Sequence, residues 1–133
     1  MLFYSIIFIS CQNSNQQPKI VDENFETFLI RFNKDSIFQL NRIDFPITVE
    51  EFSTDDFQSK KRIIREGNYQ KMDLSYDESI KIREFDKYTQ VIKFDKQKAI
   101  IEIRGIDNGI YEDVVFEKKN GKWKLITWID SST

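Results

Sequence analysis

The chain has 133 residues, 32% of them charged, but 20 Lys and Arg against 22 Asp and Glu leave a net charge of only −2. So small an imbalance excludes a strong field of one sign over the whole surface, and we expect no nucleic-acid partner. The absence of histidine excludes a Ser-His-Asp triad and the commonest metal ligand, and the single cysteine excludes an internal disulfide.

The first eleven residues form an apolar run that ends in the only cysteine, Phe8-Ile9-Ser10-Cys11. Residues 2–9 are far fewer than the roughly 20 that span a bilayer as a helix. They suit the apolar part of a signal peptide, which runs about 7–15 residues before a small-residue cleavage site. A bacterial lipobox has this form, so the sequence predicts a signal peptide over residues 1–10 and lipid attachment at Cys11. The alternative is a buried N-terminal strand with an inert cysteine.

The segment after Cys11 is polar and contains one proline, so we expect a flexible tether over residues 11–19. Residues 20–133 then form a single domain of ordinary size. A lipid, a tether and a domain together predict a bacterial cell-envelope location, at the periplasmic face or in the outer membrane. The membrane would be a partner through the covalent lipid.

Helical periodicity opens the domain, because apolar residues recur at i, i+3, i+4 and i+7 as Phe25, Phe28, Leu29 and Phe32. Asp22 is the expected N-cap, and residues 33–35 break the pattern. Asp35 or Ser36 can cap a second, short helix. A stripe on one face is typical of a helix packed on a sheet, so we interpret these side chains as core rather than as a cofactor site.

From residue 42 the apolar period changes to two, as in a strand. Residues 42–45 read as a strand stopped by Pro46, residues 47–52 as a second strand, and residues 53–56 as a turn. Residues 57–65 fit a returning strand, which we favour, although Thr54 could also cap a helix there. Residues 69–75 are expected to be irregular or a short helix.

The only basic cluster is Lys60-Lys61-Arg62 with Arg65. It could bind anionic lipid or another polyanion. We favour a solvated strand edge, because lysine on an edge strand discourages pairing with other chains.

The C-terminal third contains four β-rich runs, at residues 87–95, 97–105, 109–118 and 122–130. Asn120-Gly121 between the last two is the strongest short hairpin signal, because a type I′ turn needs positive φ at both positions. Short turns make an antiparallel meander, and helices that precede it make an α+β layer fold, with N-terminal helices packed on a curved antiparallel sheet.

A helix pair followed by a long meander that ends in Gly121-Lys122-Trp123 resembles the nuclear transport factor 2-like, or cystatin-like, cone fold. Residues 38–46, residues 105–110 and the ending at residues 120–125 are also similar to a family of uncharacterised Bacteroidetes lipoproteins, classed as a domain of unknown function. The similarity covers most of residues 20–133, and residues 53–86 match least. The resemblance implies a lipid-anchored single domain with a ligand pocket between the helices and the concave sheet, and it implies no activity.

We expect no enzyme, no cofactor and no metal site, because no Gly-rich phosphate loop, histidine or calcium loop is present. Some enzymes of the cone fold use an aspartate base with tyrosine donors in an apolar pocket, and that alternative stays open. The residues available in kind are Asp44, Asp73, Tyr69, Tyr76 and Tyr88.

The last strand suggests a partner surface. If residues 122–130 alternate without interruption, Trp123, Leu125 and Ile129 lie on one face, and Ile126 and Trp128 lie on the other. A second apolar face must be covered, either by residues 53–86 or by a partner. We therefore expect a non-catalytic binding or structural role with an unknown small ligand. The alternative is an envelope assembly protein that uses Ile126 and Trp128 to form a homodimer or to dock on another envelope protein.

Overall fold

The structure is a computed structural model that describes residues 17–19 and 21–133. The predictions of a signal peptide over residues 1–10 and of a lipid on Cys11 lie outside the described residues. Of the predicted tether, residues 17–19 are described, and they are exposed and form neither helix nor strand.

Two helices open the domain, α1 (Phe25–Lys34) and α2 (Ser36–Asn41). The Asn24 side chain accepts a hydrogen bond from the Thr27 amide at 3.0 Å, and this contact caps α1. The expectation that Asp22 caps it was wrong, because Asp22 lies outside the helix and reaches toward Lys118 instead. Asp35, one of the two caps that the sequence offered, caps α2 by accepting a hydrogen bond from the Phe38 amide, and Ser36 is the first residue of the helix.

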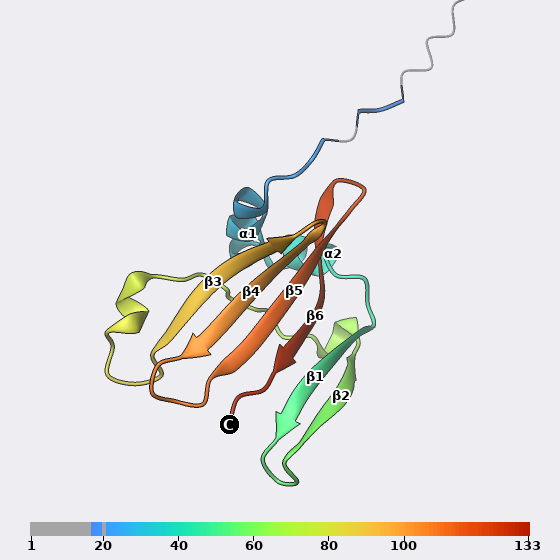
Figure 1. The fold of residues 1–133 in the computed structure, drawn as a ribbon. Coiled ribbons are helices and arrows are strands. Elements are labelled where there is room, and N and C mark those ends of the chain that lie inside the picture. Colours follow the sequence, from blue (N-terminus) through green and yellow to red (C-terminus); the bar gives the residue numbers. More distant parts are fainter. Residues whose placement is uncertain (1–16, 20) are drawn as a thin grey trace, which may run out of the picture.

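Six strands form one sheet in the order β2-β1-β6-β5-β4-β3 (Figure 1). All neighbouring strands are antiparallel except β1 and β6, which run parallel over a short stretch. The predicted α+β class with N-terminal helices on an antiparallel sheet is therefore confirmed. The strands are β1 (Ile47–Ser53), β2 (Gln58–Ile64), β3 (Tyr88–Asp95), β4 (Lys98–Gly105), β5 (Tyr111–Lys119) and β6 (Lys122–Asp130).

The strand expected at residues 42–45 was wrong. Arg42 is the C-cap of α2, so the chain is still leaving the helix there, and only Ile43 forms a bridge, to Leu125. The returning strand at residues 57–65 is confirmed as β2. The type I′ turn is also confirmed, with φ of 50° at Asn120 and 75° at Gly121.

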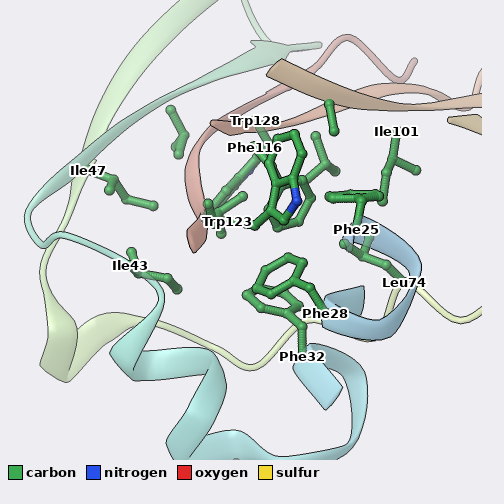
Figure 2. Close-up of a cluster of buried hydrophobic side chains, with 14 of the residues drawn as sticks. Phe25, Phe28, Phe32, Ile43, Ile47, Leu74, Ile101, Phe116, Trp123 and Trp128 are labelled. Atoms are coloured by element: carbon green, nitrogen blue, oxygen red, sulfur yellow. The ribbon is translucent and has the colours of Figure 1, made fainter. Parts of the chain in front are cut away.

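The core lies between α1 and the inner face of the sheet. Phe25, Phe28 and Phe32 of α1 are each at most 4% exposed, and each ring lies within 5.3–5.6 Å of the Phe116 ring of β5. Figure 2 shows Phe28 and Phe32 pointing toward the side chains of the sheet. The aromatic stripe read from the sequence is therefore core.

A β-bulge at Ile126 overturns the expected division of the last strand. Val115 pairs with Thr127 while the next residue, Phe116, pairs with Leu125, so Ile126 is an extra residue in β6. Beyond the bulge the two faces exchange, and Trp128, at 8% exposure, joins Trp123 in the core. Ile129, expected on the core face, is half-buried on the opposite face. The prediction of a partner surface at Ile126 and Trp128 has therefore lost its structural basis.

Residues 69–77 cover the inner face where α1 and α2 do not reach, as the ribbon between the 3-10 helices η1 (Glu66–Asn68) and η2 (Glu78–Lys81) shows (Figure 1). The Tyr69 ring lies 6.5 Å from the Trp128 ring, so the chain's own middle region covers this tryptophan. The segment is irregular, which was one of the two expectations for residues 69–75.

Gln39 attaches this segment to the helices. Its buried amide donates to the carbonyls of Phe32 and Met72 and accepts from the Met72 amide and the Tyr69 hydroxyl, at 2.6–3.0 Å. Since every hydrogen-bonding position of the amide is used, its burial is compensated. Burial raises the pKa of Tyr69 to about 12, so this hydroxyl stays a donor. Among the described residues, no helix has the length and apolarity needed to cross a membrane.

Candidate functional site

A groove of about 670 Å³ lies between α1, the segment 73–76 and the edge strand β3. From here on we call it the α1–β3 groove. Its apolar surface comes from Leu29, Ile30, Leu74 and Ile92. Charged and polar side chains surround these residues, namely Glu26, Asn33, Lys34, Asp73, Ser75 and Gln90.

Two long-range hydrogen bonds hold the groove's third wall in place. The Leu74 amide donates to the Asn33 side chain at 2.9 Å, and the Gln90 side chain donates to the Leu74 carbonyl at 2.8 Å. Leu74 is thereby attached to α1 on one side and to β3 on the other. The groove is therefore a pre-formed feature, as ligand sites usually are.

Asp73, one of the two carboxyl groups that line the groove, is not a poised base. Asp73 accepts hydrogen bonds from both the hydroxyl and the amide of Ser75, at 2.6 and 3.0 Å. These bonds hold the pKa of Asp73 below its usual range. At neutral pH the carboxyl is a fixed negative charge on the rim, beside the apolar surface.

The structure does not gather the other side chains that sequence reasoning offered for an acid–base site. Asp44 lies on the surface, where a hydrogen bond from Lys124 at 2.7 Å lowers its pKa. The Tyr69 hydroxyl donates its hydrogen bond to the side-chain oxygen of Gln39. Tyr76 lines the groove, and its hydroxyl donates to the carbonyl of Tyr88, whose ring lies 5.8 Å away.

Sequence reasoning missed a row of carboxyl groups on the inner face. Glu112 of β5 stands directly opposite Asp130 of β6, which in turn pairs with Glu51 of β1. Burial, with the nearby charges of Asp130, Asp113 and Glu51, raises the pKa of Glu112 to about 7. The sequence held no signal for this row, because the Ile126 bulge sets the pairing of Glu112 with Asp130.

The row is not a metal site by composition. Over residues 17–19 and 21–133, no group of three or more Asp, Glu or Cys side chains is arranged to hold a metal ion. Glu51 is also engaged by Arg62, whose guanidinium contacts both carboxylate oxygens at 2.6 and 3.2 Å.

A family model described as a domain of unknown function, DUF4348, matches residues 13–130. The chain belongs to this family. The family match covers both helices and all six strands, so the α1–β3 groove lies within the family's domain. No functionally curated protein matches the sequence.

Solved structures confirm the cone fold for this family member. An NTF2-like protein of Bacteroides fragilis superimposes with a TM-score of 0.60 at 21% identity over 84% of this chain, which spans 48% of that protein's length. A cystatin-like protein of Bacteroides caccae has a TM-score of 0.57 at 24% identity, with 81% of this chain and 76% of that one covered. A protein of Bacteroides uniformis has a TM-score of 0.58 at 21% identity, with the same shares of the two chains covered. At these identities the likeness establishes the fold alone.

Proposed function

We propose that this protein is a lipid-anchored cell-envelope protein whose domain binds a small, mainly apolar ligand in the α1–β3 groove without converting it. The observation that carries the proposal is the groove itself. Its volume of about 670 Å³ lies within the range of about 300–1,000 Å³ typical of ligand sites, and it combines an apolar surface with a few polar groups.

The exposed Ile30 supports a binding role. Its side chain is 59% exposed and lines the groove together with Leu29 and Ile92, so it belongs to a larger apolar surface, whereas a single exposed aliphatic residue would need no explanation. Lys34 and Asp73 flank the apolar surface with opposite charges, so a ligand with an apolar body and a polar end fits the chemistry of the lining.

The non-catalytic part of the proposal rests on what the groove lacks. Two carboxyl groups line the groove. Asp73 has a lowered pKa, which makes it a weak base, and Glu26 is exposed to solvent in the first turn of α1. Glu112, whose pKa lies near neutrality, does not line this groove.

The anchor is supported by the apolar run that ends at Cys11 and by the polar residues that follow it. The described domain begins directly after this linker. A lipid on Cys11 would hold the domain at the membrane surface, where amphipathic ligands are concentrated.

Binding of an environment-sensitive anilinonaphthalene dye tests the groove, with native mass spectrometry of the purified chain as a second measurement. We expect Ile30→Glu to weaken dye binding about tenfold. The substitution removes the apolar contact between one aliphatic side chain and the dye, and it places a charged group in the groove. Ile37→Glu is the matched control, since Ile37 is 72% exposed on α2 and outside the groove. Equal dye affinity in both variants would contradict a ligand site here.

A further inference from the structure

Positive charge is concentrated at one end of the molecule, although the chain as a whole is close to neutral. The β3–β4 and β5–β6 hairpins turn at the end where the N-terminal segment leaves the domain (Figure 1). Residues 17–19, 21–24, 94–99 and 117–124 make up this end, which we call the tether end. It has seven lysines against four carboxyl groups, a net of +3 within a chain of −2, so the rest of the molecule has a net charge of −5.

Several of these lysines are free to bind something else. Lys96, Lys98 and Lys122 are exposed, and none of them has an ion-pair partner within 4.0 Å in the described part of the chain. Neighbouring lysines are already neutralised. Lys124 and Lys119 both contact Asp44, and Lys118 contacts Asp22.

The two hairpin tips are held together, so their charges act as one surface. The Lys118 amide donates to the Gln97 carbonyl at 2.7 Å, which joins the β5–β6 hairpin to the β3–β4 turn. Phe94 lies beside Lys96 and Lys118 and is 61% exposed, which adds an apolar side chain to the charged surface. Lysines beside an exposed aromatic ring are typical of surfaces that lie on lipid headgroups.

The N-terminal segment is fastened to the same end. The Glu23 amide donates to the Gly121 carbonyl, the Trp123 amide donates to the Glu23 carboxylate, and Arg42 contacts both carboxylate oxygens of Glu23 at 2.6 and 3.0 Å. Because Glu23 is bound to the domain, any tether that begins at Cys11 ends at residue 22. Its eleven residues span about 40 Å at full extension, several times the Debye length of about 8 Å at physiological salt.

We infer that the tether end is a docking surface for anionic phospholipid, formed by Lys96, Lys98 and Lys122. The inference rests on the proposed lipid anchor. A tether that keeps the domain near the bilayer raises its effective concentration there, so that a weak electrostatic contact is enough for binding. Docking in this way points the strands away from the membrane. The β1–β2 hairpin with Asp55 and Asp56, the β4–β5 loop and the C terminus then face outward (Figure 1).

The Lys60-Lys61-Arg62 cluster fits this role less well. Lys60 contacts Asp56, and Arg62 contacts Glu51, so two of the four cations of the cluster, which includes Arg65, are paired. It lies on β2, at the other edge of the sheet from β3. This cluster serves as an internal control.

Vesicle sedimentation tests the inference on the full chain carrying Cys11→Ser, so that no acyl chain contributes. Vesicles of phosphatidylcholine containing phosphatidylglycerol are compared with vesicles of phosphatidylcholine alone. We expect the triple variant Lys96→Gln/Lys98→Gln/Lys122→Gln to bind the anionic vesicles at least about tenfold more weakly than the parent, because each basic residue near such a surface adds to the attraction. The control Lys60→Gln/Lys61→Gln/Lys71→Gln combines two lysines of the Lys60-Lys61-Arg62 cluster with the exposed Lys71, which lies outside the tether end. It removes the same charge and should bind as the parent does.

Equal losses in the two triple variants, or parent binding that is the same on neutral and anionic vesicles, would overturn the docking surface. Thermal unfolding of both variants checks that the fold is retained. Labelled-palmitate incorporation by the chain with its native Cys11 is measured separately. A chain that takes up no label but shows the lysine-dependent binding would contradict the anchor and leave the docking surface standing.

Discussion

Glu112 is the described carboxyl group whose protonation changes near neutral pH. Burial and the charges of Asp130, Asp113 and Glu51 raise its pKa from 4.5 to about 7. Between these two values the native state retains a proton that the unfolded chain has released. The free energy of unfolding therefore falls as the pH rises through this window, the reverse of the usual effect of a salt-bridged carboxylate.

Glu112→Gln should remove this pH dependence, because the amide resembles the protonated acid and carries no charge to repel Asp130. At about pH 8 we expect the variant to be more stable than the parent by about 1–2 kcal/mol, once solvent screening at this half-buried site is allowed for. Urea unfolding at a series of pH values measures the difference. Glu117→Gln, on the same strand but the outer face, is the matched control. A parent whose stability is flat between pH 5 and about 8 would show that Glu112 does not titrate there.

At the scale of the strand, the bulge at Ile126 decides where Trp128 lies. Trp128→Ala should destabilise the domain by about 3 kcal/mol or more, as a core deletion does, and so should Trp123→Ala. Ile126→Ala, two residues before Trp128 and outside the regular pairing, should cost less than about 1.5 kcal/mol. Thermal unfolding of the three variants compares them directly. A Trp128→Ala domain as stable as the parent would contradict the burial of this side chain in the core.

Local sequence predicts those elements whose conformation is determined by residues close together in the chain. The Phe25–Phe32 stripe and the Asn120-Gly121 turn are set by neighbouring residues, and both were read correctly. The Ile126 bulge was missed because one inserted residue leaves the composition of the strand unchanged while reversing its faces.

The candidate groove could be predicted only in outline. A pocket between helices and sheet followed from the resemblance to the cone fold, but its third wall did not. That wall depends on Asn33 and Gln90 bonding to Leu74, which lies 41 and 16 residues away in the chain. Residues 69–77 have no periodicity to reveal their position. Contacts between side chains and main chain at such separations leave no pattern in a single sequence.

At the scale of the whole molecule, the proposed lipid anchor and the uneven distribution of charge would act at the same end of the domain. The Glu23 contacts fasten the chain at the lysine-rich end, so a lipid at Cys11 would bring that end to the membrane first. Cys11→Ser removes the only thiol, and therefore the only residue that can take a thioether-linked lipid.

We expect Cys11→Ser to abolish labelling by radioactive palmitate and to move the protein out of the membrane pellet at high salt. High salt is part of the design, because it screens the lysine surface and leaves the covalent lipid as the only strong attachment. The triple lysine variant, with Cys11 intact, should be labelled and pelleted as the parent is, since two acyl chains hold the protein without help from charge. Measuring both variants at low and high salt separates the two attachments. A parent chain that takes up no palmitate, or a Cys11→Ser chain that stays in the pellet at high salt, would contradict the lipid anchor.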